Sequence, residues 1–281
     1  MILDRVLNSH GVASLPPNVV APGLLTTVAT GPDSVVRELK VRAARTEVAT
    51  VICDGPGLTA REGRWWRELA SRMLRLDEDL TPFYELAAAD PDLRWVVSGA
   101  GRMLAAPSVF EEVVKTICTT NCSWSATERM VGAIVALWGT EGADGRRTFP
   151  GPEELAAADI SLYLHEVRAG YRSRYLQETA QSVAEGRVDL EELRDPELPD
   201  QEVERRLRSL PGIGPYASSH LMLTALGRYD RLVLDSWTLP TWARRSGQPA
   251  TRAAVEARFD HFAGYRGLAF WLYLTEDWVA G

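Results

Sequence analysis

The hydrophobic pattern of the chain changes from short β-branched runs to helical periodicity after residue 57. Four runs rich in Val, Thr, Ile and Leu occur in the first 60 residues, at 19–20, 24–28, 34–39 and 46–53. Gly, Pro and Asp separate them, which is typical of short strands joined by turns. The pattern predicts an antiparallel sheet of about four or five strands.

Apolar residues recur at helical spacing through the rest of the chain. Thr59, with Glu62 three residues later, predicts a capping box at the start of a helix over 60–76. Further helices are expected over 81–89, 92–99, 108–120, 125–139, 152–158, 160–167, 171–186, 200–209, 215–226, 236–245, 252–262 and 267–278, with a Gly-rich charged loop over 139–150. The predicted fold class is α+β and mostly α. A small N-terminal antiparallel sheet domain covers 1–76, and a helical domain covers 77–281.

Residues 210–216 read Leu-Pro-Gly-Ile-Gly-Pro-Tyr and join two predicted helices. Gly212 and Gly214 permit positive φ and close approach of another backbone, and Ile213 between them would anchor the turn in the core. Free N–H groups at the helix start near Pro215 form an anion site that suits a DNA phosphate. A plain helical turn without a ligand is the alternative.

Composition and charge narrow the possible functions. Apolar residues make up 46% and charged residues 25%, as in ordinary globular proteins. The net charge of −7 argues against a broad nucleic-acid-binding surface, although a hairpin phosphate site needs no large basic patch. The three cysteines, the lack of a secretion signal and the lack of a membrane-span pattern predict a cytoplasmic protein.

The hairpin and Asp235, nineteen residues after Tyr216, together resemble a known family. Residues 210–245 resemble the helix-hairpin-helix base-excision DNA glycosylases, which carry a Leu-Pro-Gly-aliphatic-Gly hairpin and an aspartate at this distance. Three more segments match in the same order: 110–121 (FEEVVKTICTTN), 170–175 (GYRSRY) and 263–269 (AGYRGLA). The last two look like the 8-oxoguanine glycosylase branch, and the N-terminal sheet suits that branch and the alkylpurine branch. The resemblance implies a helical barrel over about 108–235 and DNA with a damaged base as partner. A monomer associated with the nucleoid is expected.

The resemblance assigns catalysis to Asp235, whose carboxylate would stabilise positive charge on the sugar and orient the attacking water. Asp235 could equally cap the helix expected over 236–245, and both roles can hold together. Bifunctional members carry a Schiff-base lysine where this chain has Tyr216, and a phenol forms no imine. Lys40 and Lys115, the only lysines, are no obvious replacement. A monofunctional enzyme is therefore expected. It needs no cofactor, and a monovalent cation at the hairpin is left open.

The resemblance also places a base pocket and a DNA-binding surface. The pocket residues would be Tyr216, His220, Trp237, Phe270, Trp271 and Leu274. The DNA-binding residues would be Gly212, Ile213, Gly214, Asn121, Tyr171, Arg172, Arg244 and Arg245. Asn121 would fill the gap left by the flipped base, and Arg172 would pair with the orphaned base opposite. The alternatives are core packing for the aromatics, a helix C-cap for Asn121 and solvated arginines.

Departures from the 8-oxoguanine branch bear on the substrate. Phe270 stands where that branch has glutamine, and Leu274 where it has phenylalanine. Together with the missing lysine, these changes argue against 8-oxoguanine, and an aromatic pocket suits electron-poor alkylated bases. The expected substrate is a damaged purine, alkylated or oxidised. Two alternatives stay open: a damage-binding protein without catalysis, and an N-glycosidase for single-stranded DNA or a nucleotide. The four histidines show no metal-ligand spacing, so no metal is expected.

Overall fold

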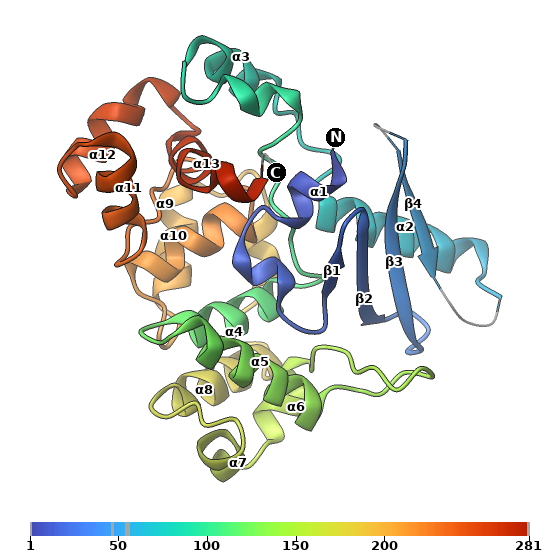
Figure 1. The fold of residues 1–281 in the computed structure, drawn as a ribbon. Helices are drawn as coiled ribbons and strands as arrows, with labels where there is room; N and C mark the ends of the chain where they lie inside the picture. The colour runs from blue at the N-terminus through green and yellow to red at the C-terminus, as the bar shows by residue number, and fades with distance from the viewer. Residues whose placement is uncertain (1, 46–47, 54–56, 280–281) are drawn as a thin grey trace.

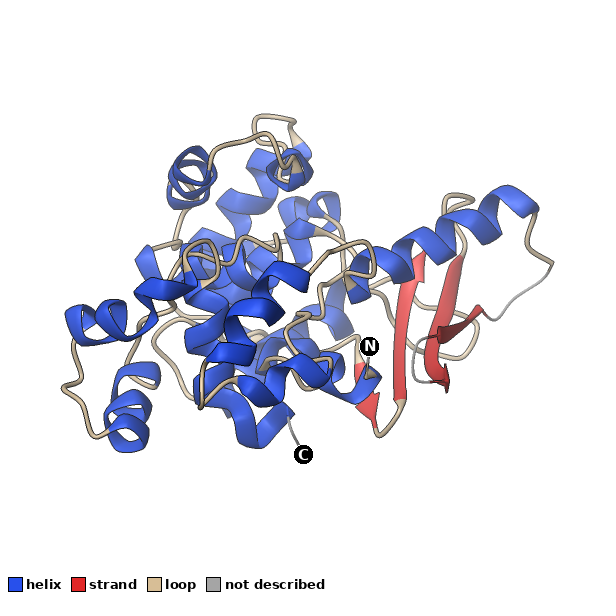
Figure 2. Ribbon diagram, turned by 90° about the horizontal axis from the view of Figure 1, so that it is seen from above, coloured by secondary structure: helices blue, strands red, loops and turns tan. Residues whose placement is uncertain are grey.

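A four-stranded antiparallel sheet stands at one end of the protein, and helices form the remainder (Figures 1 and 2). The computed structural model describes residues 2–45, 48–53 and 57–279. The strands lie in the order β1 (Val19–Ala21), β2 (Leu24–Thr30), β3 (Val36–Arg45) and β4 (Val48–Cys53). The central register pairs Leu25 with Val41 and Val28 with Glu38. The predicted fold class is confirmed, and the first two residues of the strand expected over 46–53 lie outside the described residues.

The helix α2 (Ala60–Leu74) begins with the predicted capping box. The Glu62 amide donates to Thr59 Oγ1 at 3.3 Å, and the Thr59 amide donates to Glu62 Oε2 at 2.6 Å. The helices that follow are α3 (Thr81–Ala89), α4 (Val109–Thr119), α5 (Trp124–Trp138), α6 (Pro152–Ala157), α7 (Ile160–His165), α8 (Arg172–Ala184), α9 (Asp200–Arg208), α10 (Pro215–Thr224), α11 (Thr238–Ser246), α12 (Arg252–Phe259) and α13 (Arg266–Val279). Short 3₁₀ turns lie at Gly11–Ser14, Arg94–Ser98, Glu191–Arg194 and Asp260–Phe262.

The N-terminal 60 residues are less purely β than the pattern predicts. A five-residue helix, α1 (Leu3–Leu7), and the turn Gly11–Ser14 precede the sheet. A helix this short is unstable alone, so tertiary packing must hold it. Leu3, Val6 and Leu7 are buried, and α1 contacts both β2 and α13. The segment expected to be helical over 92–99 is a 3₁₀ turn, and α11 begins two residues later than expected.

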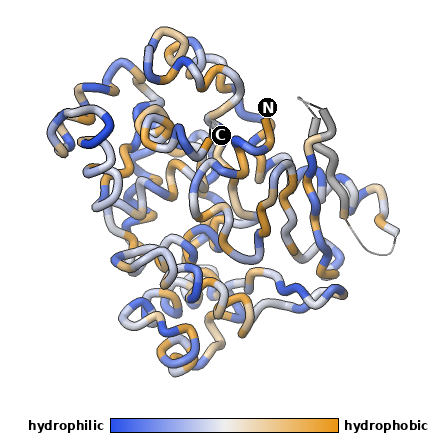
Figure 3. The backbone as a smooth tube through the Cα atoms, in the orientation of Figure 1, coloured by the Kyte–Doolittle hydropathy of each residue, from blue (hydrophilic) through white to orange (hydrophobic). Residues whose placement is uncertain are grey.

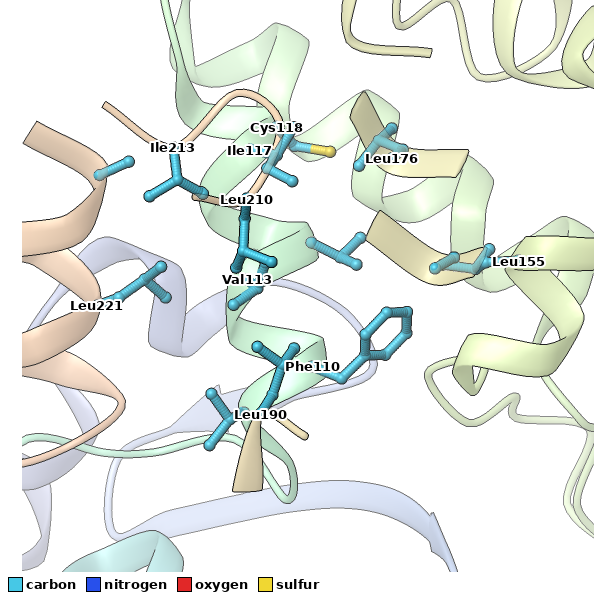
Figure 4. Close-up of a cluster of buried hydrophobic side chains, with 14 of the residues drawn as sticks. Phe110, Val113, Ile117, Cys118, Leu155, Leu176, Leu190, Leu210, Ile213 and Leu221 are labelled. Atoms are coloured by element: carbon cyan, nitrogen blue, oxygen red, sulfur yellow. The ribbon is translucent and has the colours of Figure 1, made fainter. Parts of the chain in front are cut away.

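The buried side chains form three clusters. One covers the sheet with α1 and α2, one lies among α4, α5, α8, α9 and α10, and one lies among α3, α11, α12 and α13. Figure 4 shows Leu210 and Ile213 beside Ile117 of α4 in the second cluster. Tyr216 packs against both helical clusters. The hairpin helix α10 therefore lies at the junction between them.

Two features link the sheet to the helical body. The Arg75 guanidinium, just past α2, donates to the carbonyls of Met103 and Thr224 at 3.1 and 2.6 Å. The largely hydrophilic loop between α5 and α6 extends beneath the sheet (Figures 1 and 3), where Arg146 pairs with Glu38 of β3 at 2.9 Å. No helix in the described part of the chain is long and apolar enough to cross a membrane.

Candidate active site

The hairpin has the geometry that its glycines predict. Gly212 has φ of +81°, and a Cβ there would lie 2.6 Å from Cδ2 of Tyr175. Glycine is thus required twice, by the positive φ and by the close ring. Gly214 precedes α10 with ordinary φ, and a Cβ there would meet open space. Ile213 is buried, as expected, and anchors the turn, while Pro215 at the start of α10 is exposed.

Asp235 is held by a reciprocal pair of hydrogen bonds. Its Oδ1 accepts from the backbone amides of Trp237 at 2.8 Å and Thr238 at 2.6 Å. In return, the Asp235 amide donates to Thr238 Oγ1 at 2.8 Å. Among the described residues, no donor contacts Oδ2. The carboxylate is therefore fixed through one oxygen and keeps the other available.

Asp235 lies in the wall of a cavity of about 1120 Å³ between the hairpin helix and the C-terminal helices. Four other predicted residues line it: Asn121, Tyr216, Trp237 and Trp271. Asp235 is the only charged residue among the described residues of this wall. An aromatic cavity with a single negative charge favours a flat, electron-poor or cationic ligand.

The structure adds Trp278 and Gly11, which the sequence did not reveal. Trp124, three residues after Asn121, also lines the cavity; its place in the sequence left stacking and packing as alternatives. A Cβ on Gly11 would lie 3.0 Å from Cη2 of Trp124, so the N-terminal segment forms a close wall against α5. Trp271 Nε1 donates to the Ser9 carbonyl at 2.8 Å. These contacts span most of the chain, and no local pattern signals them.

Two buried histidines lie behind the cavity wall. The His220 ring contacts Tyr216, Trp271 and His10, with centroids about 6 Å apart in each pair. His10 Nε2 donates to the Leu104 carbonyl at 2.8 Å, and Nδ1 of each histidine has no partner among the described residues. Burial lowers the pKa of His10 to about 4 and that of His220 to about 3. Both rings are neutral near pH 7, and His220 supports the wall from behind rather than lining it.

The structure does not place Phe270 and Leu274 in the predicted pocket, because neither side chain lines the cavity. Both are buried in the C-terminal cluster, where Phe270 packs edge-on against Trp242 and Phe259. Consecutive helical side chains point about 100° apart, so Trp271 faces the cavity while its neighbour Phe270 faces the core. The alternative of core packing holds for Phe270.

Asn121 and Tyr171 meet beside the hairpin. Asn121 has φ of +47°, and its Nδ2 donates to the Tyr171 hydroxyl at 3.3 Å. Tyr171 is exposed, and both side chains line a groove of about 500 Å³ with Gly212 and Gly214. A left-handed Asn is a sparsely populated conformation that functional sites often contain.

Arg172 does not occupy the position expected of a base-pairing residue. It is buried, and its guanidinium donates to the Thr120 and Ala169 carbonyls and to Thr120 Oγ1. These contacts hold the turn after α4 against the start of α8. Arg172 bonds to the protein's own backbone because this turn leaves carbonyl groups that helix hydrogen bonds do not satisfy.

The two arginines of α11 differ from each other. Arg245 pairs with Glu276 at 2.8 Å and Asp277 at 3.0 Å, so a phosphate would have to displace two carboxylates. Arg244 is exposed and donates to Thr241 Oγ1.

Both lysines are paired away from the cavity. Lys115 is buried against Glu111 at 2.6 Å, and Lys40 of β3 pairs with Glu38. Among the described residues, no group of three or more His, Cys, Asp or Glu side chains is arranged to hold a metal.

The sheet, the helical body, the glycine hairpin and the capped aspartate define the fold of the helix-hairpin-helix DNA glycosylases. In structural comparison, the 3-methyladenine DNA glycosylase from Archaeoglobus fulgidus matches 99% of this chain and 95% of its own, with a TM-score of 0.76 and 22% identity. No protein-family model matches the chain.

Sequence relatives point to the same superfamily. The Mycobacterium tuberculosis (strain CDC 1551 / Oshkosh) protein named "Probable bifunctional transcriptional activator/DNA repair enzyme AlkA" is 29% identical over 204 residues, 70% of this chain. That match spans only 40% of the relative's length. The Methanothermobacter thermautotrophicus (strain ATCC 29096 / DSM 1053 / JCM 10044 / NBRC 100330 / Delta H) "Probable N-glycosylase/DNA lyase" is 26% identical over 194 residues, 61% of each chain. The relatives and structural neighbours confirm the resemblance to this superfamily that the motifs indicated.

Proposed function

We propose that this protein is a monofunctional DNA glycosylase that removes a damaged purine, most readily an alkylated one, after the base is flipped into the cavity. The observation that carries the proposal is the position of Asp235. Its carboxylate, fixed through Oδ1, shares one aromatic cavity with Tyr216 and lies beyond the hairpin helix that could hold a backbone phosphate. DNA-repair names among the relatives support the glycosylase activity, and one of those names, "Probable N-glycosylase/DNA lyase", also includes a lyase activity.

In the proposed reaction, the bond between C1′ of the sugar and the purine nitrogen breaks, and its electron pair leaves with the base. Positive charge then develops on the sugar, and the Asp235 carboxylate stabilises it. A water molecule adds to C1′ and loses its proton to Asp235. The products are the free base and an abasic sugar, and the chemistry needs no cofactor.

The cavity supports alkylated purines in particular. Alkylation at a ring nitrogen makes the base cationic and weakens its glycosidic bond. Aromatic faces and one carboxylate attract such a cation, and no basic group of the described cavity wall opposes it. An oxidised purine is the second candidate substrate.

The water-using mechanism rests on Tyr216 and on the pairing of both lysines. A Schiff base needs a free amine near the sugar, and Lys115 and Lys40 are ion-paired elsewhere.

Release of bases from lesion-containing duplexes, detected by mass spectrometry, tests the activity. Borohydride treatment then tests the mechanism: we expect no trapped adduct for the wild type. Tyr216→Lys, which introduces an amine in the cavity, is the positive control for trapping. A wild-type adduct would overturn the monofunctional mechanism. If wild type and Asp235→Asn both bind lesion DNA and release nothing, the protein is a damage-binding protein instead.

A further inference from the structure

We infer, resting on the proposed glycosylase function, that the cavity contains a second, outer aromatic subsite that accepts a ring-sized substituent on the excised purine. The substrate class would then include bulky aromatic N-alkyl purines as well as methylated ones.

The cavity wall has an inner and an outer part. Trp271 is only 6% exposed and lies at the inner end with Tyr216. Trp237 and Trp278 are 37% and 45% exposed, and their rings stack with centroids 5.1 Å apart at an angle of 29°. Each also contacts Trp271, at 6.0 and 6.4 Å. The three indoles therefore form one continuous aromatic wall from the buried end of the cavity to its mouth.

The helix α13 places Trp278 on this wall. Thr275 Oγ1 donates to the Trp271 carbonyl at 2.8 Å, and the backbone of Thr275 leaves helical geometry. Such back-bonding by threonine bends helices. Trp271 precedes this bend and Trp278 follows it, and both side chains line the cavity.

A methylated base would use only part of this space. The cavity volume of about 1120 Å³ exceeds the roughly 300–1000 Å³ of pockets that enclose a drug-sized ligand, and one base is much smaller than such a ligand. A base beside Asp235 and Trp271 leaves Trp237 and Trp278 exposed at the mouth. Contiguous exposed aromatic surface in a monomer marks a site for an apolar partner.

The outer end of the wall is open. Trp278 also borders a separate groove of about 500 Å³ along α1 and β1, where Ile2 and Val20 contribute apolar surface. A substituent that stacks on the indole pair can therefore extend outward into space that the described residues leave open. Its cationic purine stays next to Asp235, and the bond that breaks is the same one.

The experiment uses duplex DNA treated with a methylating agent or a benzylating agent, and mass spectrometry of the bases released by the full-length protein. We expect the wild type to release both kinds of purine. Trp278→Ala should lower the ratio of benzylated to methylated purine released by about tenfold, the effect of losing one base–aromatic stack. Trp278→Phe keeps a ring and should recover most of the ratio. Leu164→Ala, an exposed apolar residue on α7, is the control and should leave the ratio unchanged.

A measurement on the wild type alone keeps the inference testable if Trp278→Ala does not fold. Quenching of tryptophan fluorescence by free 3-benzyladenine should require about tenfold less ligand than quenching by 3-methyladenine.

The outcomes separate the two proposals. Release of methylated but not benzylated purines overturns the outer subsite and leaves the proposed function intact. An equal loss of both activities in Trp278→Ala also overturns it, because the indole would then contact the DNA rather than the substituent. Release of neither kind of purine contradicts the proposed function itself.

Discussion

Asp235 and Thr238 cap each other. The Thr238 amide donates to the Asp235 carboxylate at 2.6 Å, and the Asp235 amide donates to the Thr238 hydroxyl at 2.8 Å. This arrangement satisfies backbone groups at the entry to α11 that would otherwise lack partners. It also holds the Asp235 carboxylate, which lies in the cavity wall, through one oxygen, so the same contacts serve helix formation and the proposed chemistry.

Asp235→Asn should separate capping from catalysis. The amide oxygen can still accept from Trp237 and Thr238, so we expect a change in the free energy of unfolding below about 0.5 kcal/mol. The negative charge is lost, and the rate of base release should fall by about 10²–10³-fold. Single-turnover base release and urea unfolding measure the two effects. Wild-type rates in this variant would show that another group stabilises the sugar cation.

Thr238→Val should disturb the position of the carboxylate. The substitution is nearly isosteric, but it removes the acceptor of the amide of half-buried Asp235, at a cost of about 1 kcal/mol in stability. Base release should slow while lesion-DNA binding is largely kept. Thr238→Ser restores the hydroxyl and should restore both properties. If Val and Ser variants behave alike, the hydroxyl has no positioning role.

Gly212→Ala should damage the hairpin, whereas Gly214→Ala should not. Alanine at position 212 would have to adopt a positive φ, and its Cβ would overlap the Tyr175 ring. We therefore expect a loss of about 2 kcal/mol in stability together with weaker DNA binding. Gly214 has ordinary φ and open space around a Cβ, so the expected stability loss is about 0.5 kcal/mol. Thermal unfolding and DNA titration compare the two variants, and equal losses would contradict this account.

The His10–His220 pair should make the fold sensitive to mild acid. The pKa of His220 falls to about 3 in the folded protein, from an ordinary value near 6.5, chiefly through burial and then through His10, with Asp235 acting in the opposite direction. Below pH 6.5 the unfolded state therefore binds more protons at His220 than the folded state does. The contribution of neutral His220 to the free energy of unfolding is complete above pH 6.5 and declines as the pH falls toward the pKa of the folded state. Between pH 7.5 and pH 5.0 the free energy of unfolding should fall by about 2 kcal/mol because of His220.

His220→Phe tests this by removing the titrating group while keeping a ring in the wall. The difference in unfolding free energy between pH 7.5 and 5.0, from urea curves, should be about 2 kcal/mol smaller in the variant than in the wild type. An unchanged pH dependence would show that His220 is protonated in the fold or that the fold relaxes around it.

Local interactions explain what could be predicted from the sequence. The capping box at Thr59, the positive φ of Gly212 in the hairpin and the cap at Asp235 involve residues within a few positions of one another. Their geometry depends on short-range sterics and hydrogen bonds, and the residue types alone specify it. The short helix α1 was missed because five residues have too few internal hydrogen bonds to signal a helix without their tertiary contacts.

The sequence by itself determined the small sheet, the order of the helices, the hairpin and the aspartate that follows it. Only the tertiary structure decided which side chains share the cavity. Docking of α13 placed Trp271 and Trp278 on the cavity wall and Phe270 in the core. Other long-range contacts set His10 against His220 behind that wall and buried Arg172 against Thr120. These outcomes depend on the rotation of each helix relative to neighbours far away in the chain. That rotation is set by packing over whole surfaces, which no short stretch of sequence records.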